Sequence, residues 1–252
     1  MIKGLYRVFN GGEVNGGVVF DVGAGPPIMA VDSFADFYEI GEGFYMKAST
    51  LKEGYPLQTL RPWMRGKAYG VIVYNSIKGA PLKEQNRIGA LLALGARPRL
   101  MARPTVFTGR YEARRYRMPT PQLWDAWSWI DWPTAEFHPA WSNGNELSVR
   151  SKGECRVSFH LQRGRRALLV AANYEREPQT VRVTLDAGKL GLEGQDLQCL
   201  DAITRKAIPM EGSAVSLECE PELYRYVMVG TRDEIEGPSM DPDHPRVPFG
   251  TE

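Results

Sequence analysis

The sequence predicts two kinds of structure in succession, an α/β region over residues 1–140 and a small antiparallel β-sandwich over residues 141–230. The first observation is that apolar segments of strand length alternate with helical patterns before residue 135, which is typical of a parallel sheet. The second is that short alternating segments recur about every eight to twelve residues after it, which is typical of a sandwich. The remaining residues, 231–252, are polar and contain four prolines, which predicts an extended or disordered tail.

The α/β region contains four short apolar runs of strand length. They lie at residues 18–22, 28–31, 71–76 and 99–102. Residues 82–94 (LKEQNRIGALLAL) predict a helix, because their apolar side chains recur at helical spacing. Thr120 and Pro121 predict the start of a second helix, since threonine is a favourable N-cap and proline fits the first helical position. The residues expected on its buried face are Leu123, Trp127 and Ile130, with Trp124 beside them.

The predicted sandwich is organised around one pair of strands. Residues 167–172 form a continuous apolar run, which indicates a strand buried on both faces. Residues 173–179 (NYEREPQ) predict a turn, and residues 181–185 alternate between apolar and polar side chains, so we expect a hairpin-like pair here. In neighbouring alternating segments, His160 falls on the outward side and is expected to be exposed, while Cys219 falls on the inward side and is expected in the core.

Composition and charge narrow the class of protein. A hydrophobic content of 43% and a charged content of 24% are typical of globular proteins. The net charge of +1 gives no overall attraction to nucleic acid or anionic membranes, and no segment approaches the roughly 20 apolar residues of a membrane span. The basic run at residues 110–117 (RYEARRYR) leaves two interpretations open, a solvated loop or helix end and a phosphate- or nucleic-acid-binding patch.

Motifs for metals, cofactors and export are not found. The three cysteines, Cys155, Cys199 and Cys219, have no CxxC spacing and predict neither a metal site nor a disulfide framework. The GAG at residues 23–25 is followed at once by two prolines, which disfavours a dinucleotide-binding loop. The N-terminal residues have no apolar signal-peptide core, so the chain as it starts here is not marked for export.

Several stretches occur along the chain in a recognisable order. They are SFADFYEIGE, VIVYNS, LLALGARPRLMARPT, a helix ending in WIDW, AEFHPAW, RALLVAANYEREPQTVRVTLDAGKLGL and DAITRKAIPMEGSAVSLE. Over roughly residues 5–230 the chain resembles the C-terminal part of a group of large bacterial glycoside-hydrolase-like proteins, in which a (β/α)8 barrel precedes an antiparallel β-sandwich. A complete barrel needs about 250 residues, so the resemblance implies that residues 1–140 are about the last half of one.

The residues near the predicted strand ends of the α/β region also offer candidates for a carbohydrate-binding site. Carboxylates and aromatic side chains just beyond the carboxyl end of a barrel strand are what a sugar site offers, and glycoside hydrolysis uses two carboxyl groups. The expected catalytic carboxylates are Asp36 and Glu42, and the expected substrate-binding residues are Asp21, Tyr38, Trp63 and Asn75. The alternatives stay open: an acidic surface loop, carboxylates that cap a loop or pair with arginine, and buried packing for Trp63.

We therefore expect a glycoside-hydrolase-like, carbohydrate-active protein, represented by a truncated C-terminal portion whose own active site is incomplete. The alternative is a non-catalytic carbohydrate-binding or structural module, which would complete its half barrel by self-association through unpaired strand edges. In both cases the expected partner is a carbohydrate, not nucleic acid or a membrane, and no cofactor or metal is expected. The resemblance implies that full-length relatives are exported.

Overall fold

A computed structural model describes residues 19–21, 37–40, 68–72, 97–99, 120–132 and 134–236. The chain divides into two compact units, Met1–Tyr116 and Arg117–Glu252, and each has its own architecture. Most of the described residues lie in β-strands, chiefly antiparallel ones, with few helices. The boundaries expected from the sequence, at residues 140 and 230, stay a prediction.

The described residues of the first unit form one parallel sheet. Its strands lie side by side in sequence order: β1 (Val19–Asp21), β2 (Phe37–Ile40), β3 (Ala68–Ile72) and β4 (Arg97–Arg99). Strands β3 and β4 begin a few residues earlier than the sequence predicts, and β2 lies where we expected a loop beyond a strand. The high β propensity of Phe37, Tyr38 and Ile40 explains β2. That this sheet belongs to a partial barrel stays a prediction.

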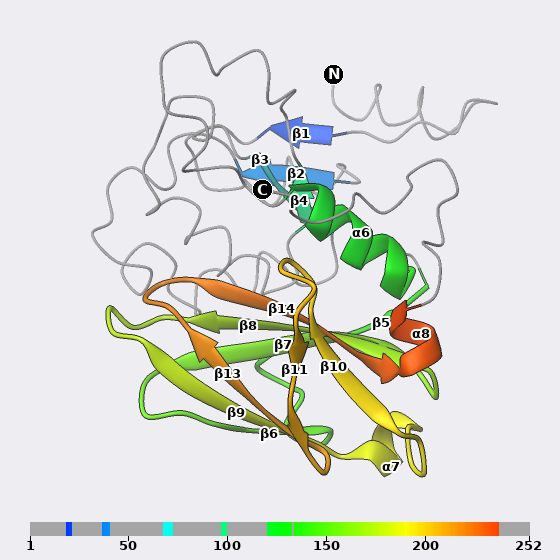
Figure 1. The fold of residues 1–252 in the computed structure, drawn as a ribbon. Helices are drawn as coiled ribbons and strands as arrows, with labels where there is room; N and C mark the ends of the chain where they lie inside the picture. Colours follow the sequence, from blue (N-terminus) through cyan, green and yellow to red (C-terminus); the bar gives the residue numbers. More distant parts are fainter. Residues whose placement is uncertain are drawn as a thin grey trace, which may run out of the picture. The chain divides into compact units, whose positions relative to one another are not determined.

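The second unit is a sandwich of two antiparallel sheets, which face each other in Figure 1. The six-stranded sheet has the order β11 (Ala207–Ile208), β10 (Leu197–Asp201), β14 (Tyr224–Thr231), β8 (Arg166–Asn173), β7 (Cys155–Gln162) and β5 (Glu136–His138). The four-stranded sheet has the order β12 (Met210–Glu211), β13 (Ala214–Cys219), β9 (Gln179–Leu185) and β6 (Leu147–Arg150). The prediction of antiparallel strands after residue 135 is confirmed.

The core lies between the two sheets and follows the alternation of the sequence. In β7 the inward side chains are Val157, Phe159 and Leu161, and in β13 they are Val215, Leu217 and Cys219. All of these side chains are buried, so the predicted core position of Cys219 is confirmed. Burial raises the pKa of the Cys219 thiol to about 12, which keeps it protonated at neutral pH.

The expected hairpin-like pair is wrong, although both of its strands exist. β8 pairs with β7 and β14, whereas β9 pairs with β13 and β6, so residues 174–178 carry the chain from one sheet to the other. The reason is that β8 is buried along its whole length and needs a neighbour on each side and cover on both faces. A continuous apolar segment predicts a strand at the centre of a sheet, but it does not identify the two strands that pair with it.

The predicted helix is present as α6 (Thr120–Ile130). Trp127 and Ile130 are buried as expected, and Trp129 is buried as well. The helix covers the outer face of the six-stranded sheet: the indole of Trp127 donates to the Tyr226 hydroxyl at 3.3 Å and lies 5.8 Å from the ring of His160. The expectation that His160 is exposed is therefore wrong, since only 8% of it is accessible beneath this helix.

Two short helices complete the second unit. Helix α7 (Ala187–Leu190) follows β9 and is capped by Asp186, whose carboxylate accepts from the backbone N–H of Lys189 at 3.1 Å. Helix α8 (Arg232–Glu236) follows β14, within the segment that the sequence predicts to be extended. Its Ile235 is buried, which explains why these residues fold back on the sandwich. Among the residues that the structure describes, no helix has both the length and the hydropathy of a membrane span.

Candidate functional site

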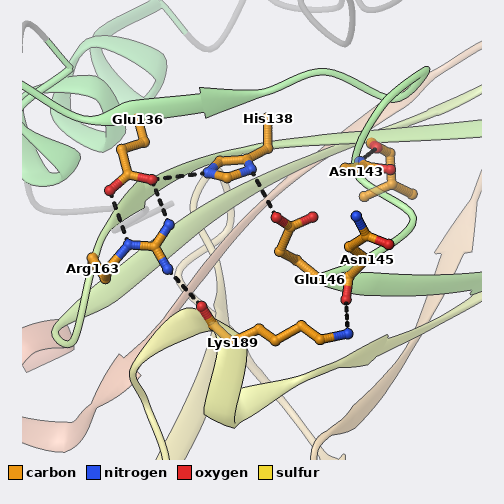
Figure 2. A network of polar contacts seen from close by, with 8 residues as sticks. Glu136, His138, Asn143, Asn145, Glu146, Arg163 and Lys189 are labelled. Carbon is orange, nitrogen blue, oxygen red and sulfur yellow. Dashed lines mark hydrogen bonds and ion pairs between the residues drawn. The ribbon is translucent and has the colours of Figure 1, made fainter.

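A group of acidic and basic side chains from several segments lies at one edge of the sandwich (Figure 2). We call it the edge cluster, and its members are Glu136, His138, Glu146, Arg163 and Lys189. Glu136 and His138 project from β5 on the side of the sheet that faces the core, because both pair in register with inward residues of β7. Glu146 precedes β6, Arg163 lies in the turn between β7 and β8, and Lys189 belongs to α7. The cluster thus bridges the edge strands of the two sheets.

The central residue of the edge cluster is His138. Its Nε2 lies 3.3 Å from Oε2 of Glu136, and its Nδ1 lies 3.7 Å from Oε1 of Glu146. Its ring is stacked on that of Phe159, with centroids 4.3 Å apart and planes inclined by 7°. The imidazole therefore covers a fully buried core residue while both of its nitrogens face carboxylates.

Arg163 holds the other end of the cluster. Its guanidinium donates from Nε and Nη2 to the two oxygens of Glu136, at 3.0 and 2.6 Å, and from Nη1 to the carbonyl of Lys189 at 2.6 Å. These bonds from Arg163 hold the pKa of the Glu136 carboxyl below its usual value, and Glu136 in turn raises the pKa of Arg163. Both groups are charged at neutral pH.

The side chains of the edge cluster make their polar contacts mainly with one another. Both ring nitrogens of His138 face acidic side chains, Nε2 toward Glu136 and Nδ1 toward Glu146. The Glu136 carboxylate is occupied on both oxygens by Arg163. Within the described residues no group of three or more His, Cys, Asp or Glu side chains could hold a metal ion.

A second polar group fastens α8. The Glu234 carboxylate accepts from Arg165 at 2.8 Å and from Arg166 at 2.9 Å, and its backbone carbonyl accepts from the Trp129 indole at 2.7 Å. Arg166 is only 3% exposed, and its guanidinium lies over the Trp129 ring, 5.1 Å from the centroid. Burial lowers the pKa of Arg166, and Glu234 partly offsets that effect.

The six site residues predicted from the sequence all belong to the first unit. Asp21 is the last residue of β1, at its carboxyl end, and Tyr38 lies within β2, where its backbone pairs in register with Phe20. Asp36, Glu42, Trp63 and Asn75 lie outside the described residues, as does the basic run at 110–117. The roles of all six residues stay predictions.

The edge cluster was not predicted from the sequence. Its signal is the alternation in Glu136-Phe137-His138, which places the glutamate and the histidine on one side of a strand. The partners cannot be identified in this way, because Glu146, Arg163 and Lys189 come from three separate segments of the chain.

Comparison with known proteins identifies the class of fold. No protein-family model and no curated protein sequence matches the chain. Solved structures do match it, and three glycoside hydrolases are among them. Because the sequence identities are low, these matches concern the fold.

A GH27 β-L-arabinopyranosidase from Geobacillus stearothermophilus matches with a TM-score of 0.53 and 11% identity, over 92% of this chain and 53% of that one. An α-amylase from Geobacillus thermoleovorans, complexed with acarbose, matches with a TM-score of 0.52 and 10% identity, over 92% and 57%. An α-amylase from Anoxybacillus matches with a TM-score of 0.50 and 11% identity, over 85% and 52%. The chain therefore has a glycoside-hydrolase-like fold, and it spans about half the length of these structures.

Proposed function

We propose that this chain is the C-terminal portion of a glycoside-hydrolase-like, carbohydrate-active protein, in which the first unit is about half of a (β/α)8 barrel and the second unit supports it. The observation that carries the proposal is the order of parts. Parallel strands β1 to β4, adjacent in sequence order, are followed by an antiparallel sandwich. Consecutive parallel strands that lie side by side are the arrangement of a (β/α)8 barrel.

The carbohydrate partner is supported by the likeness in fold. Two of the matching structures are a β-L-arabinopyranosidase and an α-amylase complexed with acarbose, so the proteins similar to this chain in fold include ones that act on or bind sugars. In a parallel barrel the ligand lies at the carboxyl ends of the strands, where Asp21 ends β1. We propose that Asp21, Tyr38, Trp63 and Asn75 contact a sugar and that Asp36 and Glu42 supply carboxylates to the same site.

The edge cluster supports a structural role for the sandwich. Its charged side chains are bonded to one another, and over residues 125–132 and 134–236 one large hydrophobic side chain is exposed, Phe137, which is 37% accessible. Sugar-binding faces generally present several aromatic rings, so we assign carbohydrate binding to the first unit. The sandwich then serves to stabilise the barrel.

Gel retardation of the whole chain by soluble polysaccharides tests this function. We expect retardation by at least one neutral or acidic polysaccharide, reduced at least about tenfold in affinity by Asp36→Asn or Glu42→Gln, since a lost charged hydrogen bond costs about 1.5–3 kcal/mol. Glu193→Gln, an exposed carboxylate of the second unit, is the control and should bind as the unchanged chain does.

Turnover of aryl glycosides by the same samples separates the remaining possibilities. Binding without turnover is expected, because the chain corresponds to about half of the fold. No retardation by any polysaccharide would overturn the proposal. Binding that persists in both variants would remove Asp36 and Glu42 from the site.

A further inference from the structure

Two of the three cysteines lie at the same end of the sandwich, on the two sheets that face each other. Cys155 begins β7 in the six-stranded sheet, where it pairs in register with Asn173 of β8. Cys219 ends β13 in the four-stranded sheet, where it pairs in register with Gln179 of β9. Because residues 174–178 carry the chain from Asn173 to Gln179, the two cysteines flank the same crossing between the sheets.

The side chains of both cysteines are directed toward the core between the sheets. Cys219 is 1% exposed and belongs to that core, and Cys155 is partly buried and packs against it. The alternation of β7 agrees with this placement, because Cys155 lies on the same side of the strand as the buried residues Val157 and Phe159. The two thiols therefore face one interior region from opposite sheets.

The contacts of Asn173 connect the two cysteines. Its Oδ1 lies 3.9 Å from the Sγ of Cys155, and its Nδ2 donates to the backbone carbonyl of Cys219 at 3.1 Å. One short side chain thus reaches from the thiol of one cysteine to the backbone of the other. Burial chiefly raises the pKa of the Cys219 thiol to about 12, and the nearby Cys155 adds to this effect.

The two cysteines differ in their access to a reagent in solution. Cys155 is partly exposed, so a small molecule can reach its sulfur. Cys219 is buried, so its sulfur can react only with a group inside the protein. This difference sets an order of reaction, in which Cys155 meets the reagent first and Cys219 reacts second.

We propose that Cys155 and Cys219 are a redox pair that closes a disulfide bond between the two sheets by exchange with a small-molecule disulfide such as oxidised glutathione. The Cys155 thiolate attacks one sulfur of the small disulfide, whose S–S bond breaks and releases one small thiolate. The Cys219 thiolate then attacks the Cys155 sulfur, and the second small thiolate leaves. The two cysteines are oxidised, the small disulfide is reduced to two thiols, and these take up the two protons that the cysteines lose. The pair concerns the second unit alone and does not depend on the proposed sugar site.

Oxidation of the folded whole chain tests the pair. The chain is incubated with oxidised glutathione without denaturant, the remaining thiols are alkylated, and the cross-linked peptides are identified by mass spectrometry after digestion. We expect one intramolecular bond that joins Cys155 to Cys219, with an intact mass lower by about 2 Da for the two hydrogens removed. Because a closed loop restricts the unfolded chain, the oxidised chain should melt at least about 5 °C above the reduced chain.

Cys199 provides a matched control, because it is also a buried core residue. It lies in β10, beside the part of β14 that pairs with Ala167, at the opposite end of β8 from Asn173. Cys199→Ala should therefore still form the bond between Cys155 and Cys219.

Two further variants separate the steps of the exchange. Cys219→Ala should stop at the mixed disulfide, in which Cys155 carries one glutathione. Cys155→Ser should form neither the mixed disulfide nor an internal bond, because the two cysteines that remain are both buried.

The proposal is overturned if the oxidised chain contains no bond between Cys155 and Cys219, or if Cys199 takes part in the bond instead. It is also overturned if the oxidised chain melts no higher than the reduced one. If circular dichroism shows that Cys219→Ala does not fold, Cys155→Ser decides in its place, and an internal disulfide formed in that variant would contradict the proposal.

Discussion

The side-chain amide of Asn173 donates to the backbone carbonyl of Cys219 at 3.1 Å, and this bond joins the end of β8 in one sheet to the end of β13 in the other. The same nitrogen also contacts the carbonyls of Glu177 and Glu220, and its Oδ1 accepts from the N–H of Glu175 at 2.8 Å. Asn173 is fully buried. It therefore secures the point where the chain crosses between the sheets.

Asn173→Asp should destabilise the sandwich strongly. A carboxylate at this position would turn an oxygen toward backbone carbonyls that now receive an N–H. We expect a loss of about 3 kcal/mol in the free energy of unfolding, the upper part of the range for a buried polar group left unpaired. Urea unfolding followed by tryptophan fluorescence measures it. Asn145→Asp, at an exposed side chain, should change stability by less than about 0.5 kcal/mol.

Glu234→Ala should loosen α8. The substitution leaves Arg166 buried without its carboxylate partner, and we expect a cost of about 3 kcal/mol, the lower end of the range for a broken buried ion pair. The double variant Arg166→Met with Glu234→Leu should recover most of this loss, because no buried charge then remains. Limited proteolysis beyond β14 and urea unfolding are the measurements. Similar stability of the single and double variants would contradict this interpretation.

Glu136 should contribute stability that depends on pH. Its pKa in the folded protein is lowered, chiefly by Arg163, so its contribution is present above the usual glutamate value of 4.5. That contribution is lost as the pH falls through the lower folded-state value. The urea concentration at the unfolding midpoint should therefore decrease less between pH 6 and pH 3 in Glu136→Gln than in the unchanged chain. If the urea midpoint of this variant falls as steeply between pH 6 and pH 3 as that of the unchanged chain, the bond to Arg163 contributes nothing to stability in solution.

The two faces of β13 should respond differently to truncation. Leu217→Ala removes a buried side chain from the core between the sheets, and we expect a loss of about 2–5 kcal/mol. Ser216→Ala, one residue earlier on the exposed face, should change stability by less than about 0.5 kcal/mol. Equal effects of the two substitutions would mean that the strand is not oriented as described.

Much of the sandwich could be predicted from the sequence, because alternation is a local property. The inward faces of β7 and β13 follow directly from every second residue being apolar. The pairing of β8 could not be predicted, because its partner β14 lies some fifty residues later and nothing in β8 identifies it. His160 was placed wrongly for a related reason, since the alternation of β7 carries no information about the helix that covers its outer face.

The contacts of the edge cluster also could not be predicted from local sequence patterns. Glu136 and His138 could be paired from their spacing, but Arg163 joins them only because a turn and an edge strand meet in three dimensions. The predicted carbohydrate-binding residues rest on the chemistry of their side chains near predicted strand ends. They remain predictions, and gel retardation of the Asp36→Asn and Glu42→Gln variants tests the two expected catalytic carboxylates.

The place of β8 between β7 and β14 has a consequence for synthesis of the chain. The eight residues of β8 acquire their first neighbour from the segment just before them, but their second begins only at Tyr224. Until that residue has left the ribosome, one edge of the most apolar strand in the sandwich has no hydrogen-bonding neighbour. A nascent chain halted before Tyr224 would therefore expose a long hydrophobic edge, the kind of surface that chaperones bind and that aggregates form on.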